Sequence, residues 1–330
     1  MSDTFSRYHP AVNFLFFALV LVYSMVLMHP VCLLISLLGA VLYVIQLNGR
    51  KGLRLSLRIA LPVMLLAALV NPAFNHAGMT ILTYLPTGNP LTLESILYGL
   101  AAGAMLCAVL LWFVCYNRVL TSDKFVYLFG RVIPALSLVL SMTLRFVPRF
   151  KQQMDTVRQS QFCIGRDASS GSVWQRAKKA VTIFSIMVTW ALENAIETSD
   201  SMRSRGYGLK GRTAFSIYHF TRKDKYVLGM MIGLSAIFTG GCIKGAAYAS
   251  YDPRILLAGF TIHGYAAPIS VSPLLALLTY LCFAAFCFLP VLLDVTETIR
   301  FSYSRRKETA DLEMTYQKIY QTLEQEGTDR

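Results

Sequence analysis

The chain has 330 residues, of which 55% are hydrophobic and only 15% are charged. Soluble domains usually carry about 25% charged residues, so this composition excludes an ordinary soluble protein and indicates a surface that largely faces lipid. Lys and Arg number 31 against 18 Asp and Glu, which gives a formal net charge of +13. Such an excess suits the cytoplasmic loops of a membrane protein, and equally nucleic acid, anionic lipid or an acidic protein partner.

Six apolar stretches approach the roughly 20 residues that a helix needs to cross about 30 Å of hydrocarbon. We predict membrane spans at Ala11–Met28, Val31–Leu47, Ile59–Val70 with the preceding Leu53–Leu57, Ser95–Tyr116, Tyr226–Ile243 and Val271–Leu293. A further apolar stretch, Ile255–Pro268, is short and contains two glycines. It is consistent with either a re-entrant or an external segment.

Basic residues in the loops predict the orientation of these spans. The segment Asn48–Arg58 carries four basic residues, Asn71–Glu94 carries none, and Tyr116–Lys225 carries eighteen against seven acidic ones. Positively charged loops stay on the cytoplasmic side, so we expect the long loop and both termini to be cytoplasmic. Only Lys244 and Arg254 oppose this orientation, as isolated basic residues on the predicted outer side.

The long loop is too apolar to be disordered, and connections of this length are functional or disordered. It contains two apolar stretches, Val132–Val147 and Ala180–Leu192, which are too short to span comfortably and are flanked by charge. We interpret them as buried or interfacial helices, and two long helical arms packed on one another would fit.

The predicted fold class is all-α: a polytopic membrane protein with about six transmembrane helices and a helical cytoplasmic domain. Its predicted parts are N-terminal transmembrane helices in residues 1–116, the cytoplasmic domain in 117–225, C-terminal transmembrane helices in 226–298 and a polar cytoplasmic tail in 299–330.

The sharpest local signal is Ser204-Arg205-Gly206, which follows an amphipathic stretch that favours helix. Gly206 predicts a left-handed helix C-cap, and Arg205 in the last turn suits the helix dipole. One interpretation is therefore a well-capped helix end. The other is that Arg205 protrudes as a fork of donors that binds carboxylates or carbonyls in a groove on a partner.

Four segments in order resemble a known family, the transmembrane T component (EcfT/CbiQ type) of energy-coupling factor importers of vitamins and metal ions. The segment from Asn71-Pro72 to Gly78 resembles the family's N-P-x-F-x-x-x-G pattern, and Leu144-Arg145-Phe146-Val147-Pro148 resembles L-R-F-x-P. Val157–Asp167 and Ser204-Arg205-Gly206 occupy the places of its two Ala-Arg-Gly-type coupling motifs. The resemblance covers roughly residues 10–300.

The resemblance implies that the chain joins two ABC-type ATPase subunits to a separate membrane-embedded substrate-binding subunit, the S component. Two cytoplasmic coupling helices of such a protein end in the Ala-Arg-Gly-type motifs and dock in grooves of the ATPases. ATP would bind to the partner subunits, with no cofactor on this chain, which would not be an enzyme by itself. We expect a multi-pass protein of the plasma membrane, surrounded by the lipid bilayer, with no nucleic-acid partner.

The first coupling motif departs from the family pattern. It reads Cys163-Ile164-Gly165, with Ile164 where the family carries Arg. Gly165 keeps the expected helix stop, and Arg158 or Arg166 could supply a guanidinium from a neighbouring turn. We therefore expect the second motif to carry more of the charged docking.

Two prolines predict interruptions of helices, because proline disfavours helix in the residue before it. Asn71-Pro72 predicts the end of the third span. Pro148 predicts a helix break after Arg145, which would form an elbow between the two arms.

A self-contained secondary transporter or channel is the main alternative. That class usually carries ionisable residues or Gly and Pro breaks in mid-span, and the first four spans show little of this. A membrane enzyme would need clustered His, Asp or Glu at the interface, and such residues do not cluster in this sequence. Neither metal-ligand spacing nor a nucleophile–base arrangement is present, so we expect no catalytic, cofactor or metal site.

Overall fold

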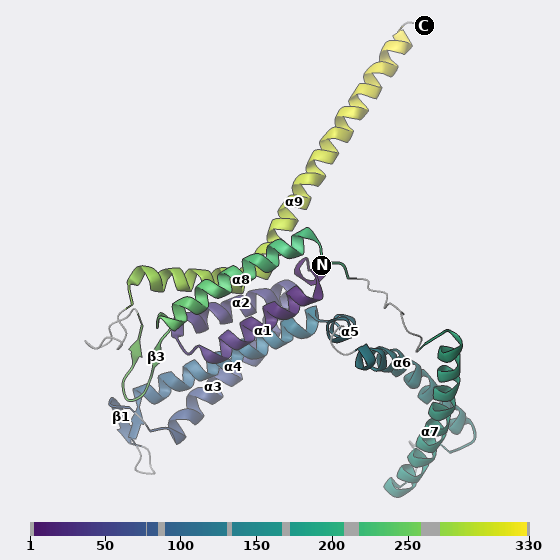
Figure 1. Ribbon diagram of the computed structural model, residues 1–330, viewed down its shortest axis with the longest axis horizontal. Coiled ribbons are helices and arrows are strands. Elements are labelled where there is room, and N and C mark those ends of the chain that lie inside the picture. Colours follow the sequence, from purple (N-terminus) through teal and green to yellow (C-terminus); the bar gives the residue numbers. More distant parts are fainter. Residues whose placement is uncertain are drawn as a thin grey trace. The chain divides into compact units, whose positions relative to one another are not determined.

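The computed structural model describes residues 3–76, 78–84, 90–130, 134–166, 172–207, 218–258 and 271–328. The chain divides into two compact units, one made of residues 1–121 with 220–330 and the other of residues 122–219. Helices make up most of both units (Figure 1), which confirms the predicted all-α membrane fold. The assignment of the parts to sides of the membrane stays a prediction.

The first unit is a helical bundle with two small β-hairpins. Figure 1 shows α1, α2, α3, α4 and α8 side by side, and α8 and α2 also contact α9. The helices are α1 (Pro10–Val26), α2 (Pro30–Asn48), α3 (Arg50–Phe74), α4 (Leu93–Val119), α8 (Arg222–Ile243) and α9 (Pro273–Thr328), preceded by the 3-10 turn η1 (Phe5–Arg7). The antiparallel hairpins pair β1 (Ile81–Tyr84) with β2 (Pro90–Thr92) and β3 (Ala249–Ser250) with β4 (Leu256–Leu257).

The sequence explains where these helices begin. Pro10 and Pro30 occupy the first helical positions of α1 and α2, where the missing N–H is not needed and the fixed φ suits the helix. At the start of α4, the hydroxyl of Thr92 accepts a hydrogen bond from the N–H of Ser95 at 3.3 Å. This N-cap satisfies a donor that would otherwise be unpaired at the start of α4.

Among the described residues, six helices are long and apolar enough to cross a membrane by length and composition, and five of them match predicted spans. The six are Pro30–Asn48, Arg50–Phe74, Leu93–Val119, Val173–Ser204, Arg222–Ile243 and Pro273–Arg306. The first predicted span forms α1, which has only 17 residues because the chain leaves the helix after Val26 to make the turn into α2. The sixth candidate is α7 (Val173–Ser204), which has 32 residues and extends well beyond the short apolar run of residues 180–192.

The core of the first unit is built from aromatic rings. Phe16, Phe17 and Trp112 are fully buried. The ring centroid of Phe16 lies 5.7 Å from that of Trp112 and 5.3 Å from that of Phe286, at edge-on or tilted angles. Rings in these arrangements contribute beyond the area that they bury, so α1, α4 and α9 share one well-packed centre.

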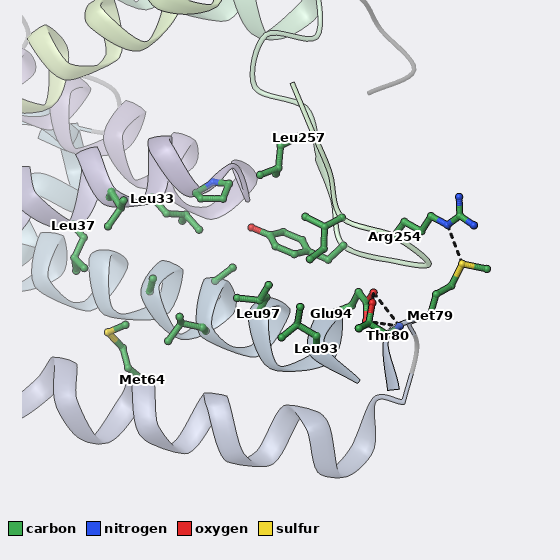
Figure 2. A pocket seen from close by; sticks show the side chains of 17 residues that line it. Leu33, Leu37, Met64, Met79, Thr80, Leu93, Glu94, Leu97, Arg254 and Leu257 are labelled. Atoms are coloured by element: carbon green, nitrogen blue, oxygen red, sulfur yellow. Dashed lines mark hydrogen bonds between the residues drawn. The ribbon is translucent and has the colours of Figure 1, made fainter. Parts of the chain in front are cut away.

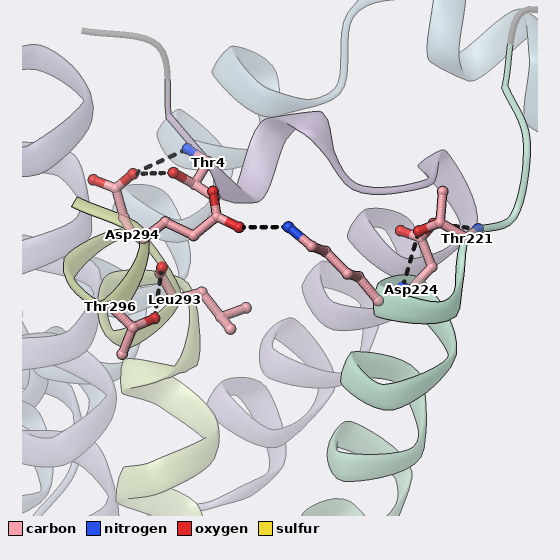
Figure 3. Close-up of polar contacts among 8 residues, drawn as sticks. Thr4, Thr221, Asp224, Leu293, Asp294 and Thr296 are labelled. Carbon is pink, nitrogen blue, oxygen red and sulfur yellow. Dashed lines mark hydrogen bonds and ion pairs between the residues drawn. The ribbon is translucent and has the colours of Figure 1, made fainter. Parts of the chain in front are cut away.

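Carboxylates tie the N-terminal segment to the last two helices (Figure 3). Asp294 of α9 accepts hydrogen bonds from the N–H of Thr4 at 3.0 Å and from its hydroxyl at 2.7 Å. Asp224 in the first turn of α8 accepts one from the N–H of His9 at 2.9 Å. Hydrogen bonds to charged groups are stronger than neutral ones, so residues 4–9 fasten α8 and α9 to the rest of the bundle.

The second unit consists of α5 (Ser122–Gly130), α6 (Pro134–Cys163) and α7. Helices α6 and α7 pack along a narrow seam whose buried members are Val157, Ile183 and Met187. Phe150 and Trp190 extend it, with ring centroids 5.3 Å apart in an edge-to-face arrangement. Together with the partly buried Met154, the seam residues recur at spacings of four and three along each helix, which places them on one face.

The helix break predicted after Arg145 is wrong, and the third span ends two residues later than the predicted Asn71-Pro72. Pro72 lies inside α3, which continues to Phe74, and Pro148 lies inside α6, which continues to Cys163. A proline removes one backbone hydrogen bond and costs about 3 kcal/mol in a helix interior. Both helices nevertheless continue past the proline.

Several apolar side chains of the two apolar stretches in the second unit are exposed, although Ile183 and Met187 are buried in the seam. Val139 and Val147 of α6 are 59% exposed, and Phe184 and Leu192 of α7 are 65% and 63% exposed. The interpretation as buried helices is therefore wrong for these described side chains. The interfacial interpretation stays a prediction.

Candidate coupling site at the ends of α6 and α7

The end of α6 is closed by two backbone hydrogen bonds. The N–H of Gly165 donates to the carbonyl of Phe162 at 3.0 Å, and the N–H of Arg166 donates to the carbonyl of Gln161 at 2.9 Å. Gly165 has a φ of 72°, a left-handed conformation that costs glycine nothing. This pair of bonds is the Schellman arrangement of a helix C-terminus, and it places Ile164 at the C-cap.

The end of α7 repeats the same arrangement. The N–H of Gly206 donates to the carbonyl of Arg203 at 3.0 Å, and the N–H of Tyr207 donates to that of Met202 at 3.1 Å. Gly206 has a φ of 76°, which confirms the predicted left-handed cap. Arg205 is the C-cap residue here. Arg205 of α7 therefore occupies the position that Ile164 occupies in α6.

A third helix shows that this backbone motif is a general helix stop. At the end of α8, the N–H of Gly245 donates to the carbonyl of Cys242 at 2.9 Å, and the N–H of Ala246 donates to that of Gly241 at 3.0 Å. Lys244 is the C-cap. The motif alone does not identify a docking site, so any function of the other two ends rests on their side chains and their setting.

The side chains at the two ends differ in chemistry. At the α6 end, Phe162 and Ile164 are 67% and 61% exposed beside the exposed Cys163. At the α7 end, Ser204 and Arg205 are exposed. Exposed large apolar side chains rimmed by polar residues mark interaction surfaces, and an exposed guanidinium offers five donors in a fixed fork. One end is therefore suited to an apolar groove and the other to an acidic one.

A basic pocket of about 370 Å³ lies between the end of α6 and the first turns of α7. Its cations are Arg166, directly after the α6 end, and Lys178 and Lys179 from the first turns of α7. The polar groups that complete its lining are Gln161, Gln175 and Thr182. Of the two arginines predicted to replace the missing guanidinium, Arg166 therefore lies with other cations at this end, and Arg158 is not part of the lining.

The family model described as "Cobalt transport protein" (CbiQ) matches residues 3–215 of the chain. This match covers well over half of the sequence and includes the ends of both α6 and α7. The chain belongs to the CbiQ family. The predicted resemblance reached to about residue 300, whereas α8 and α9 lie beyond the residues matched to CbiQ.

Curated relatives of this CbiQ family member carry the name energy-coupling factor transporter transmembrane protein EcfT. The protein from Bacillus selenitireducens is 33% identical over 102 residues, which cover 31% of this chain and 38% of the relative. The one from Bacillus subtilis is 34% identical over 103 residues, 31% and 39% of the two chains. The one from Lactobacillus helveticus is 33% identical over 110 residues, 32% and 40% of the two chains. The aligned part thus spans about two fifths of each relative.

The first motif segment of this CbiQ family member joins α3 to α4. The side-chain amide of Asn71 donates to the carbonyl of Ser95 at 3.1 Å, and Pro72 is buried. Gly78 has a φ of 143°, and a Cβ there would lie 2.6 Å from a carboxylate oxygen of Glu94. These residues hold the start of α4 against the end of α3, so their contacts are within the bundle and not at the helix ends.

The second motif segment lies in the middle of α6. Arg145 and Pro148 are both exposed. At 1.5 Å rise per residue, Arg145 is about 28 Å along the helix from Ile164. The structure therefore does not bring this segment to the end of α6.

Two features of the structure were not predicted from the sequence. The α4 glycines Gly99 and Gly103 form a G-x-x-x-G pattern that allows close helix approach, and a Cβ at either would lie within 3 Å of an atom of Ala67 in α3. That pattern could have been found in the sequence. The cluster of Arg166 with Lys178 and Lys179 could not, because it depends on how α7 folds back beside α6. In the described part of the chain, no group of three or more His, Cys, Asp or Glu could hold a metal ion.

Proposed function

We propose that this chain is the membrane subunit that couples ATPase closure to substrate release in an energy-coupling factor importer. Its membership of the CbiQ family and its EcfT-named relatives support this function. The observation that carries the proposal is the exposure of Ile164 and Arg205 at the ends of two helices that share one seam.

In this proposal each helix end docks in a groove of one ABC-type ATPase subunit. Arg205 binds carboxylates or carbonyl oxygens, which its planar guanidinium matches with paired hydrogen bonds. Ile164 and Phe162 enter an apolar groove, and Arg166 adds positive charge beside it. The two docking contacts are therefore chemically different, and each ATPase groove is adapted to its own helix end.

The seam between α6 and α7 gives the coupling a mechanical basis. The side chains of Val157, Ile183 and Met187 fill the interface between the two helices. Packed interiors resist deformation and transmit displacement. When ATP-driven closure moves one helix end, the other helix follows, and the displacement reaches the S component that holds the vitamin or metal ion.

The remaining roles belong to partner subunits. ATP binds to the two ATPases, and the transported vitamin or metal ion is recognised by the S component. The chain itself is a multi-pass protein of the plasma membrane, with both termini and the second unit in the cytoplasm, as the distribution of basic residues predicts.

The test is co-purification of the chain with its ATPase and S subunits. Wild type is compared with Arg205→Glu and with Lys244→Glu, which reverses the charge at the same backbone position of α8. We expect a stable complex for wild type and for Lys244→Glu, and loss of ATPase from Arg205→Glu. If wild type purifies without an ATPase and transports substrate alone after reconstitution, the chain is a self-contained transporter and the proposal is wrong.

A further inference from the structure

The first unit contains an apolar cavity of about 620 Å³ between α2, α3, α4 and the β3–β4 hairpin (Figure 2). Side chains from the two longer walls point into it, among them Leu33 and Leu37 from α2 and Leu97 from α4. Met64 of α3 closes its deep end. Its volume lies within the range of roughly 300–1,000 Å³ that is typical of small-molecule sites.

The depth of the cavity matches one leaflet of a bilayer. On α4 its lining runs from Leu93 to Ala104, which corresponds to about 16 Å along the helix. Half of a hydrocarbon core of about 30 Å is about 15 Å. An acyl chain that enters from one leaflet would therefore run along the length of this cavity.

The mouth of the cavity is polar. Glu94 lies there, and its carboxylate accepts hydrogen bonds from the hydroxyl of Thr80 at 2.8 Å and from the Thr80 N–H at 3.2 Å. Arg254 reaches the same end from the hairpin, and its Nε donates to the sulfur of Met79 at 2.9 Å (Figure 2). A guanidinium at this position can bind a phosphate with paired, charge-assisted hydrogen bonds.

This position also accounts for an oddity of the sequence. Arg254 and Lys244 are basic residues on the predicted outer side, against the usual distribution. Arg254 lines the cavity mouth, whereas Lys244 caps α8 and is not part of the lining. A cation beside an apolar cavity of leaflet depth has the chemistry of a phospholipid site.

We infer that the cavity holds one acyl chain of an outer-leaflet phospholipid, with the lipid phosphate at Arg254. This site goes beyond the proposed coupling function and does not depend on it. The acyl chain contacts Leu33, Leu37, Leu97 and Leu100, and Ala101 faces its path.

The inference is tested in the assembled complex in lipid nanodiscs that contain phosphatidylethanolamine with a diazirine on one acyl chain. After irradiation, the labelled residues are identified by mass spectrometry. We expect labelling of Leu97 and Leu100. Exposed residues of α3, Leu65 and Leu69, report contact with bulk lipid and serve as the internal reference.

Three variants decide the result. Ala101→Phe fills the cavity and should largely abolish labelling of Leu97 and Leu100 relative to Leu65. Arg254→Gln should lower the labelling of Leu97 and Leu100 about five-fold, because one basic residue near a lipid surface raises lipid affinity by about that factor. Lys244→Gln, the matched control, should label as wild type. If the complex that carries Ala101→Phe does not assemble, the labelling of the Arg254→Gln complex alone tests the inference.

Two outcomes would overturn the inference. Equal labelling in wild type and Arg254→Gln, relative to Leu65, would mean that only bulk lipid reaches the cavity. Labelling of Leu97 that appears only when the S component is left out would mean that a protein partner occupies the space. Neither result bears on ATPase docking, which the Arg205→Glu complex tests separately.

Discussion

The ends of α6 and α7 have the same backbone and opposite chemistry. Both close with the same two hydrogen bonds and a left-handed glycine, yet one presents Ile164 at its C-cap and the other Arg205. The end of α8 shares the backbone as well, with Lys244. The glycine therefore determines where each helix ends, whereas the C-cap side chain determines what that end can bind.

The largest effect is expected for Arg205→Glu. If the guanidinium is hydrogen bonded in an acidic groove, its reversal should cost about 2–5 kcal/mol of binding free energy. The measurement is the affinity of the purified chain for the ATPase by biolayer interferometry. An affinity within two-fold of wild type would show that the two ends do not differ in the way that their side chains indicate.

Loss of packing in the seam should destabilise α6 and α7 together. Met187→Ala opens a cavity in a small core and should cost about 2 kcal/mol of stability in the second unit. Hydrogen exchange should then rise in α6 as well as α7. Met230→Ala, at an exposed position of α8, is the control and should leave both helices unchanged. Faster exchange in α7 alone would show that the helices move independently.

An intermediate effect is expected for Ile164→Ala. Removing an apolar side chain that is buried on docking should weaken ATPase binding by about 1–2 kcal/mol without lowering the stability of the chain, because Ile164 is exposed. Ile243→Ala, 82% exposed at the end of α8, should have no effect. Tighter binding by Ile164→Arg would contradict an apolar groove at this end.

The smallest effect tests the shared backbone. Gly165→Ala and Gly206→Ala should each cost about 1 kcal/mol, since a side chain disfavours the left-handed conformation. Thermal unfolding midpoints should fall by similar amounts in both variants. Gly229→Ala in α8, where a Cβ would meet open space, should show no loss. Unequal falls in the unfolding midpoint would show that the two helix ends are not structurally equivalent.

Local chemistry made part of this structure predictable. Pro10 and Pro30 begin helices, and Gly165 and Gly206 end them, because each residue's own φ preference decides the outcome. The break predicted at Pro148 failed because a proline removes only one backbone hydrogen bond, and α6 continues past it. Whether α7 is long enough to be a candidate span depends on its full helix length. A count of uninterrupted apolar residues does not give that length.

The candidate site was predictable in its positions and not in its surroundings. The sequence indicated Ile164 and Arg205 as equivalent positions, and the structure places both at C-caps. The pocket around Arg166 requires the fold of α7 beside α6. Likewise, the bond between Thr4 and Asp294 joins residues 290 positions apart, and no local pattern specifies such a pairing.

The docking of the two helix ends is tested most directly by site-specific photo-crosslinking. A benzoylphenylalanine is placed singly at Cys163, Ser204 or Ile243, which are the last helical residues of α6, α7 and α8, in cells that also express the ATPase and S subunits. The account predicts crosslinks to an ATPase from positions 163 and 204 and none from 243. An intact complex without an ATPase crosslink from either 163 or 204 would contradict it.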